Sequence, residues 1–273
     1  MTQDFYDEVY RVDHPSQYGG KKDGMPQRTN SLTPQTTAWL EQIGFASWPE
    51  AKILEIGCGM AFLAKVHPGW HGVEYSRTAV ARVKSRDGNA TKIFEGDAQC
   101  LPFADASFDG IYTWAALEHV PDPNKAFVEI DRVLRGGGYG LIAPAWNCRS
   151  WTVKKIELRP VSELTWMELI ERYSIPFREM LIVRALQALP QRLSAELRLC
   201  FKVPQPLRYR VLHPCWDLIA QYGHVSDDDA VADIDPHAGI CFFESRGYQV
   251  ISHPNWVKRL TARHEPLLIR KPL

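Results

Sequence analysis

The chain has no excess of charge of either sign and no long apolar run. Lysine and arginine number 32 in 273 residues, as do aspartate and glutamate, and the isoelectric point is about 7.1. Because a neutral protein has no overall field for a polyanion, we expect no nucleic-acid partner. No uncharged apolar stretch approaches the roughly 20 residues of a membrane span, and the charged start MTQDFYDEVYRVDH is unlike a signal peptide. We therefore expect a cytoplasmic protein.

The cysteines lack the spacing of a metal knuckle. No two of the six form a Cys-x-x-Cys motif. A chain of this size with 45% apolar residues has enough core to fold without disulfides. We expect reduced thiols at Cys58, Cys100, Cys148, Cys200, Cys215 and Cys241.

Short apolar runs alternate with helical patterns along most of the chain. Repeated strand–helix–strand units indicate an α/β fold with a parallel, doubly wound sheet. The patterning predicts strands at 52–57, 69–75, 91–96, 108–114 and 137–145, and helices at 76–86 and 122–135. A helix at 235–247 and strands at 248–253 and 266–271 continue the pattern at the end of the chain.

The rhythm is interrupted between residues 146 and 235, where the patterning is mainly helical, as at 161–173 and 175–189. Near the N-terminus, Tyr6, Tyr10 and Tyr18 suit either a lid over a ligand or ordinary packing. We therefore predict four parts, which are an N-terminal helical lid (1–50), an α/β core (51–145), a helical cap insertion (146–235) and a C-terminal completion of the core (236–273).

The stretch ILEIGCGMAFLA (53–64) places two glycines directly after the first predicted strand. A dinucleotide fingerprint needs a third glycine where Phe62 stands, and a P-loop needs a lysine where Met60 stands, so NAD and ATP are disfavoured. Glu55 would repel a phosphate but would suit a ligand with a positive centre. S-adenosylmethionine (SAM) has an ammonium and a sulfonium, and the N–H groups at the start of the following helix would receive its carboxylate.

Two further acids fall at strand ends. Glu74 closes the second strand, 19 residues after Glu55, which is the spacing at which an acid accepts hydrogen bonds from two ribose hydroxyls. Asp97 follows the third strand and would accept from an adenine amino group while the backbone N–H of Ala98 donates to the ring. Each acid alone is more often a solvated strand end, but the ordered set is far more specific.

These motifs resemble those of the class I SAM-dependent methyltransferases, and among them the ubiquinone and menaquinone methyltransferase-like branch. The matching stretches within 52–145 are ILEIGCGMAFLA, GVEYS, EGDAQCLPFADASFDGIYTWAALEHVPDP and EIDRVLRGGGYGLIAP. The resemblance implies a Rossmann-like seven-stranded sheet whose last strand is antiparallel, with SAM across the carboxyl ends of the strands. It also implies cofactor contacts by Glu55, Gly57, Cys58, Gly59, Glu74, Asp97, Ala98 and Trp114.

His119, just after the fourth strand, is the candidate catalytic residue. A near-neutral pKa suits removal of a proton from an acceptor hydroxyl, although a histidine at this place in the pattern also serves to tie loops together. Some quinone O-methyltransferases bind a metal through Glu-x-x-Glu-His, but Ala115 stands where the first glutamate is needed. We therefore expect no metal, with the acidic run 227–229 left as a second source of oxygen ligands.

The cap carries the only indication of the acceptor. Residues 149–210 hold twelve lysines and arginines against six acids. This excess favours an anionic acceptor such as a sugar nucleotide, a glycan on a phosphate carrier or a phosphorylated metabolite, or peripheral contact of 175–193 with a membrane. Alternatively, the arginines only solvate the outer helix faces. We predict O-methylation of a small-molecule or glycan-type hydroxyl, with C- or N-methylation, or a non-catalytic SAM-binding scaffold, as alternatives.

Overall fold

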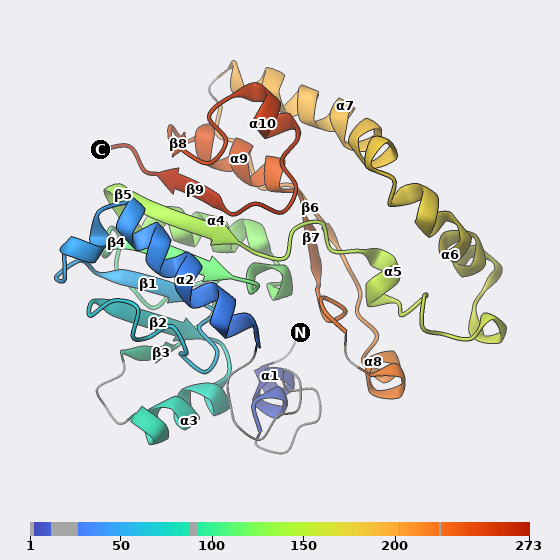
Figure 1. The fold of residues 1–273 in the computed structure, drawn as a ribbon, viewed down its shortest axis with the longest axis horizontal. Helices are drawn as coiled ribbons and strands as arrows, with labels where there is room; N and C mark the ends of the chain where they lie inside the picture. The colour runs from blue at the N-terminus through green and yellow to red at the C-terminus, as the bar shows by residue number, and fades with distance from the viewer. Residues whose placement is uncertain (1–2, 12–26, 88–91, 202, 224) are drawn as a thin grey trace.

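The computed structural model describes residues 3–11, 27–87, 92–201, 203–223 and 225–273. Figure 1 shows a central sheet with helices against it and an arc of two helices, α6 (Trp166–Arg178) and α7 (Leu181–Leu199), along one side of the molecule. Among the described residues no helix is both long enough and apolar enough to span a bilayer. The predicted lid residue Tyr18 lies outside the described part of the chain.

The main sheet has seven strands in the order β3-β2-β1-β4-β5-β9-β8. Neighbours from β3 to β5 are parallel, whereas β9 runs antiparallel to both β5 and β8. This confirms the predicted α/β sheet with an antiparallel last strand. The strands are β1 (Ile53–Ile56), β2 (Trp70–Glu74), β3 (Ile93–Glu95), β4 (Phe108–Trp114), β5 (Leu134–Ala143), β8 (Gln249–Val250) and β9 (Leu267–Arg270).

Helices cover the sheet because each presents an apolar stripe to it. In α4 the residues Ala126, Phe127, Ile130 and Val133 are buried, and Asp122 caps the helix by accepting from the N–H groups of the first turn. The strand β5 begins directly after α4, three residues earlier than the sequence pattern predicts. The helices of this part are α2 (Gln27–Gln42), α3 (Arg77–Asp87), α4 (Pro123–Val133), α9 (Pro236–Glu244) and α10 (Trp256–Leu260).

The expectation of a helix directly after the glycine turn is wrong. Residues 59–65 form successive turns, in which Ala61 N–H donates to Cys58 O and Ala64 N–H donates to Ala61 O. Gly57, Gly59 and Ala61 all have positive φ, which a right-handed helix does not allow. The structure therefore has no helix N-terminus at this place to receive a carboxylate.

The segment after β5 contains a small sheet that the sequence pattern misses. Strands β6 (Tyr209–Val211) and β7 (Ala232–Ile234) pair antiparallel, and each is too short to show alternation of apolar residues. The N–H of Val231 donates to Glu118 O, which joins this hairpin to the carboxyl edge of the main sheet. The remaining elements are α5 (Ser150–Val153) and α8 (Trp216–Tyr222), with 3-10 turns η1 (Phe45–Ser47), η3 (Leu117–His119) and η4 (Val161–Glu163).

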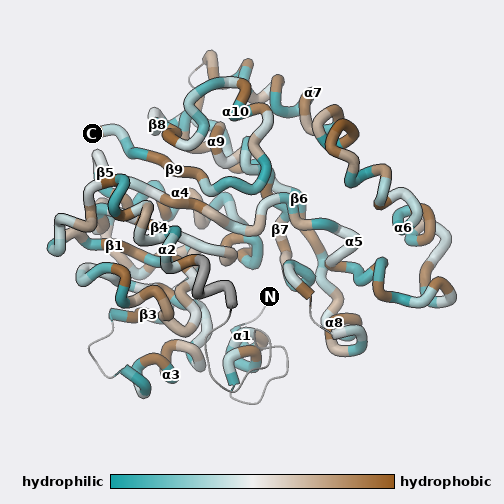
Figure 2. The backbone as a smooth tube through the Cα atoms, viewed as in Figure 1, coloured by the Kyte–Doolittle hydropathy of each residue, from teal (hydrophilic) through white to brown (hydrophobic). Residues whose placement is uncertain are grey.

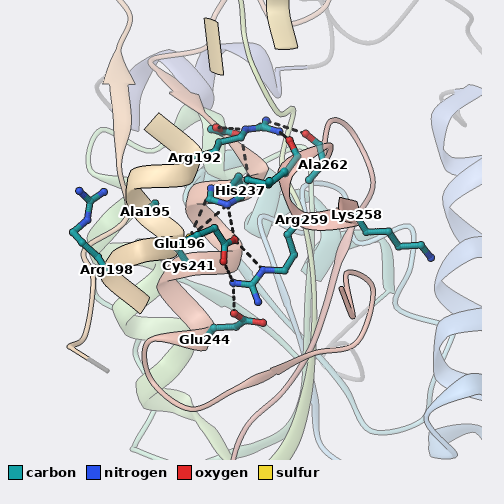
Figure 3. Close-up of polar contacts among 12 residues, drawn as sticks. Arg192, Ala195, Glu196, Arg198, His237, Cys241, Glu244, Lys258, Arg259 and Ala262 are labelled. Carbon is teal, nitrogen blue, oxygen red and sulfur yellow. Dashed lines mark hydrogen bonds and ion pairs between the residues drawn. The ribbon is translucent and has the colours of Figure 1, made fainter. Parts of the chain in front are cut away.

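The second half of α7 is tied to α9 and α10 by ion pairs (Figure 3). Arg192 pairs with Asp235 and donates to the carbonyl oxygens of Leu260 and Ala262. One turn further along α7, Glu196 accepts two hydrogen bonds from Arg259, at 2.8 and 3.0 Å. These contacts hold one end of the helical arc against the body of the protein.

A buried ion pair fixes the loop before β7. Lys155 Nζ donates to Asp228 Oδ2 and to Gly223 O, and both charged side chains are fully buried. Asp228 Oδ2 also accepts from Val225 N–H at 2.8 Å. Because each ion is desolvated, removal of one leaves the other uncompensated.

We expect Asp228→Ala to lower the free energy of unfolding by about 3–5 kcal/mol, because it leaves the Lys155 ammonium buried without its partner. Lys155→Met with Asp228→Leu should recover most of that loss, since no buried charge remains. Urea titration followed by circular dichroism measures both variants. Glu8→Ala is the control, because it breaks only an exposed pair with Arg11 and should change little. Equal stability of Asp228→Ala and the native chain would contradict the assignment.

Candidate functional site

The strand order brings the predicted site residues into a row. Strands β3, β2, β1 and β4 are neighbours and parallel, so their carboxyl ends meet at one edge. Along that edge stand Asp97, Glu74, the glycine turn 57–59 and the turn η3 with His119. Open parallel sheets bind ligands at such an edge.

The glycine turn needs its glycines. Gly57 has φ +73°, and a Cβ there would lie 2.4 Å from the Cβ of Ala116. Gly57 and Cys58 both donate their N–H groups to Val73 O, at 2.9 and 3.1 Å. Burial, reinforced by the charges of nearby carboxylates, raises the pKa of the Cys58 thiol, so the thiol is protonated and contributes packing between β1 and β2.

Glu74 connects the glycine turn to the next strand. Its Oε2 accepts from Gly59 N–H at 2.8 Å, and its Oε1 accepts from Ser76 N–H at 2.9 Å. The residue is only 6% exposed. Burial raises the pKa of the Glu74 carboxyl, and the two backbone N–H groups partly offset that rise.

Glu55 lies within the core. Its Oε2 accepts from Trp70 Nε1 at 2.8 Å and from the Tyr112 hydroxyl at 3.1 Å. Burial raises the pKa of Glu55 to about 8, although both hydrogen bonds act in the opposite direction. A carboxyl with that pKa carries little charge at neutral pH, so Glu55 attracts a cationic ligand less than its position in the sequence suggests.

The remaining predicted cofactor residues differ in their placement. Asp97 Oδ1 accepts from Gln99 N–H at 2.8 Å, so its carboxylate is fixed at the end of β3. Ala98 is half-buried and packs against the apolar core. Trp114 donates from Nε1 to Thr36 Oγ1 at 3.1 Å, so its polar edge is directed to α2.

His119 lies between two carboxylates. Its Nε2 is 3.5 Å from Glu118 Oε1, and its Nδ1 is 3.5 Å from Asp229 Oδ2. Burial lowers the pKa of the imidazole, but Glu118 and Asp229 outweigh burial and hold that pKa above its usual value. Glu118 is fully buried, which raises the pKa of its own carboxyl. The acidic run 227–229, which the sequence left as a separate feature, thus lies beside His119.

The helix α1 (Gln3–Val9) lies against this edge. Asp7 Oδ1 accepts from the Ser76 hydroxyl at 2.8 Å and from Thr78 N–H at 3.0 Å. The Tyr6 ring is 6.4 Å from the His119 ring, and a Cβ on Gly59 would lie 2.9 Å from the hydroxyl oxygen of Tyr10. The sequence singled out the tyrosines but missed Asp7, whose partners are about seventy residues away along the chain.

A cavity of about 680 Å³ opens beyond the end of β5, between α5, α6 and α7. Arg149 and Arg184 line it and share one acid, Glu179, at 3.1 and 3.7 Å. Burial lowers the pKa of His264 in the cavity wall, and the charge of Arg184 lowers it further. Asp227 also lines the cavity, and its charge acts on His119. Ala145 of the wall also hydrogen-bonds the Glu118 carboxyl through its backbone, so the cavity adjoins the His119 cluster, although His119 itself is not part of the wall.

One group among the described residues has the composition of a metal site, namely Glu196, His237 and Cys241. Glu196 is already engaged by Arg259 through both oxygens and by His237 Nε2 at 2.8 Å (Figure 3). Burial raises the pKa of the Cys241 thiol to about 12, which disfavours the thiolate that metals bind. This arrangement favours a structural ion-pair network.

Comparison with known proteins agrees with the fold. Residues 54–142 match the family model described as a methyltransferase domain. An O-methyltransferase of Aspergillus nomiae is 32% identical over 130 residues, which are 43% of this chain and 58% of that relative. An O-methyltransferase of Aspergillus sclerotiorum is 36% identical over 130 residues, which are 43% of this chain and 49% of that relative. A probable S-adenosylmethionine-dependent methyltransferase of Mycobacterium tuberculosis is 34% identical over 33% of this chain and 34% of its own length.

The solved structure of protein PH0226 from Pyrococcus horikoshii is 25% identical, covers 56% of this chain and 72% of its own, and has a TM-score of 0.42. The strand order and the sequence matches together identify a class I methyltransferase domain of Rossmann-like fold. The cofactor of this class is SAM. Sterol 24-C-methyltransferases also occur among the relatives, so the ubiquinone and menaquinone branch is not singled out and stays a prediction.

We expect Glu74→Ala to weaken binding of S-adenosylhomocysteine by about 100-fold, because hydrogen bonds to a charged acceptor contribute about 1.5–3 kcal/mol each. Isothermal titration calorimetry measures the change. Glu50→Ala is the control, since Glu50 is an exposed acid in the loop before β1, at the opposite end of that strand from the glycine turn. Undiminished affinity in Glu74→Ala would rule out Glu74 as a cofactor contact.

Proposed function

We propose that the protein transfers a methyl group from SAM to a hydroxyl of an anionic small molecule or glycan-type acceptor. The observation that carries this proposal is the position of His119 between two carboxylates, at the edge that also presents Glu74 and next to a cavity with two arginines. The O-methyltransferases among the relatives support the choice of oxygen as the accepting atom.

The row of strand ends holds the cofactor in this proposal. Glu74 accepts from the ribose hydroxyls through the lone pairs that its hydrogen bonds from Gly59 N–H and Ser76 N–H leave free. Asp97 and Ala98 contact the adenine at the end of β3. Bound SAM would supply a methyl group on a positively charged sulfur. The protein aligns the acceptor oxygen with that methyl group, and such alignment lowers the activation barrier by roughly 7–11 kcal/mol.

His119 takes the proton from the acceptor hydroxyl as the methyl group is transferred. The proton goes to Nε2 of His119 as the oxygen–methyl bond forms and the sulfur–methyl bond breaks, while Asp229, 3.5 Å from the buried Nδ1, and the charge of Glu118 stabilise the resulting imidazolium. A raised imidazole pKa makes the ring a stronger base, at the cost of a smaller neutral fraction at low pH. The geometry thus suits a base that is active above its raised pKa.

The cavity beside this cluster holds the acceptor. Arg149 and Arg184 share Glu179 there, and Glu157 and Asp227 also line the wall, so the two guanidinium groups bind an anionic group by direct contact and not through a net positive charge of the cavity. The segment 146–235, which supplies most of the cavity wall, thereby selects the acceptor. Helix α1, which contacts Trp216 of α8 through Phe5 at a ring distance of 4.1 Å, closes the edge as a lid.

Two other functions share these features. A sterol 24-C-methyltransferase among the relatives favours the second candidate, transfer to carbon, in which His119 would not remove a hydroxyl proton. A scaffold without activity would bind S-adenosylhomocysteine and transfer no methyl group to any acceptor.

The function is tested by incubating the protein with methyl-labelled SAM and fractionated cell metabolites and identifying the labelled products by mass spectrometry. We expect an anionic product methylated on oxygen. Arg184→Gln should then raise KM for that acceptor about tenfold or more, because a charged contact is lost, with affinity for S-adenosylhomocysteine unchanged. Arg208→Gln, an exposed arginine outside the cavity wall, is the control. A neutral product, or label on carbon, would refute the proposed acceptor.

The role of His119 predicts a pH dependence. The neutral ring is the active form, so kcat/KM should fall as pH drops through the raised pKa, above the usual value of about 6.5. Asp229→Asn removes a negative charge and should move this acid limb to lower pH. Asp217→Asn, an exposed acid on α8, should leave the limb in place. If His119→Ala retains both the rate and the acid limb, the general-base role is wrong.

A further inference from the structure

The loop before β7 carries two acids of the candidate site, and a buried ion pair holds it in place. Asp229 Oδ2 is 3.5 Å from His119 Nδ1, and Asp227 lines the cavity. Asp228, between these two acids, pairs with Lys155, and both side chains of the pair are fully buried. Figure 2 shows α5 beside the β6–β7 pair, and the ion pair joins these two parts of the cap.

One attachment joins the loop to the turn η3, which carries His119. Val231 N–H donates to Glu118 O at 2.9 Å, next to the start of β7. The preceding residues 225–230 lie outside the β6–β7 pairing, which begins at β7 itself. The side chain of Asp229 therefore needs a second attachment to stay directed at the imidazole.

Lys155, just beyond α5, supplies this second attachment. Its ammonium group donates to Asp228 Oδ2 and to Gly223 O, so it joins α5 both to the loop and to the end of α8. The same oxygen of Asp228 accepts from Val225 N–H at 2.8 Å, which closes the loop into a turn. Because Asp229 is the next residue along the chain, any displacement of Asp228 displaces Asp229 with it.

The backbone around the ion pair is strained. Lys155 has φ +56° and Asp227 has φ +66°, a conformation that costs free energy in residues other than glycine. Such strain persists where the surrounding contacts impose it, and it is concentrated at functional sites. A buried ion pair is also weak evidence for a role in stability, because apolar residues of similar volume are often as stable. A role in stability alone thus leaves both the charge and the strain unexplained.

The groups that act on His119 come from three elements. Glu118 lies beside it in η3, and the ring of Tyr6 on α1 lies 6.4 Å away. Asp227 and Asp229 act on it from the loop. Burial lowers the pKa of the imidazole, whereas the charges of Glu118, Asp229 and Asp227 raise it, and the backbone of Asp229 acts in the same direction. The position of the loop therefore affects the basicity of His119.

We propose that Lys155 is a positioning residue, which holds Asp228 so that Asp229 stays directed at Nδ1 of His119. The two charges of the ion pair are opposite and in contact, so their fields largely cancel at the imidazole. The ion pair therefore acts through the placement of Asp229 and not through its own charge. This inference rests on the proposed function only where it takes His119 to be the base, because the positioning is a property of the folded chain.

NMR titration of the histidine side chains tests the positioning without SAM or an acceptor. The signal of His119 is the one missing from the spectrum of His119→Gln, and the midpoint of its titration is the pKa of the imidazole. Lys155→Met with Asp228→Leu, which we call the apolar variant, removes the attachment and leaves no buried charge. In the apolar variant the pKa of His119 should fall as far as in Asp229→Asn, because the carboxylate that raises it is displaced.

Asp228→Glu is a second variant, which keeps both charges of the ion pair. Its longer side chain displaces the loop, so it should also lower the pKa of His119, whereas a role in stability alone would leave that pKa unchanged. Lys154→Met with Glu171→Leu is the matched control, since it removes a more exposed ion pair that joins the same end of α5 to α6. Circular dichroism checks that each variant is folded, and Asp228→Glu carries the test alone if the apolar variant is not.

A combined variant decides whether Lys155 acts through Asp229. Adding Asp229→Asn to the apolar variant should lower the pKa of His119 no further than Asp229→Asn does alone, because both changes remove the same contact. Additive decreases would mean that the ion pair acts on His119 by another route, which overturns the proposal. An unchanged pKa of His119 in both the apolar variant and Asp228→Glu also overturns it.

The positioning is separable from the methyl transfer. In the pH profile of kcat/KM, the apolar variant should move the acid limb to lower pH, since the neutral imidazole then persists to lower pH. A decrease in the pKa of His119 in the apolar variant, together with full activity of His119→Ala, would refute the general base and leave the positioning intact. An unchanged pKa of His119 in the apolar variant and in Asp228→Glu, together with loss of activity in His119→Ala, would do the reverse.

Discussion

The carboxylate of Glu74 is the contact on which the geometry of the site depends. It accepts from Gly59 N–H and Ser76 N–H, so it fixes the glycine turn after β1 relative to the end of β2. Without it, two N–H groups at the carboxyl edge would lose their acceptor while remaining largely shielded from water. The glycine turn carries positive φ at Gly57 and Gly59 and is held on its other side by Ala116. A single carboxylate thus positions the turn between the two strands at the edge where we propose that the cofactor binds.

The elements of residues 51–145 are readable from the sequence because a parallel sheet is buried on both faces. Its strands, such as β1 and β4, appear as continuous apolar runs, and α4 shows one apolar stripe with an aspartate cap. The prediction of a helix after the glycine turn was wrong. The residues at 60–64 are mostly apolar, as in a helix that packs against a sheet, but the positive φ values of Gly57, Gly59 and Ala61 produce turns there instead. The strands β6 and β7 escaped detection because three residues are too few for any periodicity.

The site residues were only partly predictable, because their environment depends on contacts remote in sequence. Glu55 meets Trp70 and Tyr112, which are 15 and 57 residues away, and these contacts turn an expected charge into a largely neutral buried carboxyl. Asp229 reaches His119 from the far end of the cap. The sequence suggested both groups without a way of placing them together. The hydrogen bond from Val231 N–H to Glu118 O joins the β6–β7 hairpin to η3. This contact brings the acidic run 227–229 close enough to His119 to raise the pKa of its imidazole.

The helical arc distributes its side chains to two environments at once. Its inner side needs charge, because it must bind to the body of the protein through Arg192 and Glu196 and line the cavity with Arg184. Once the charges are used there, the outer side is left with leucine, methionine and aromatic residues. The cap therefore separates a charged inner side, which lines the cavity and binds the body of the protein, from an outer face of exposed apolar side chains on α6 and α7.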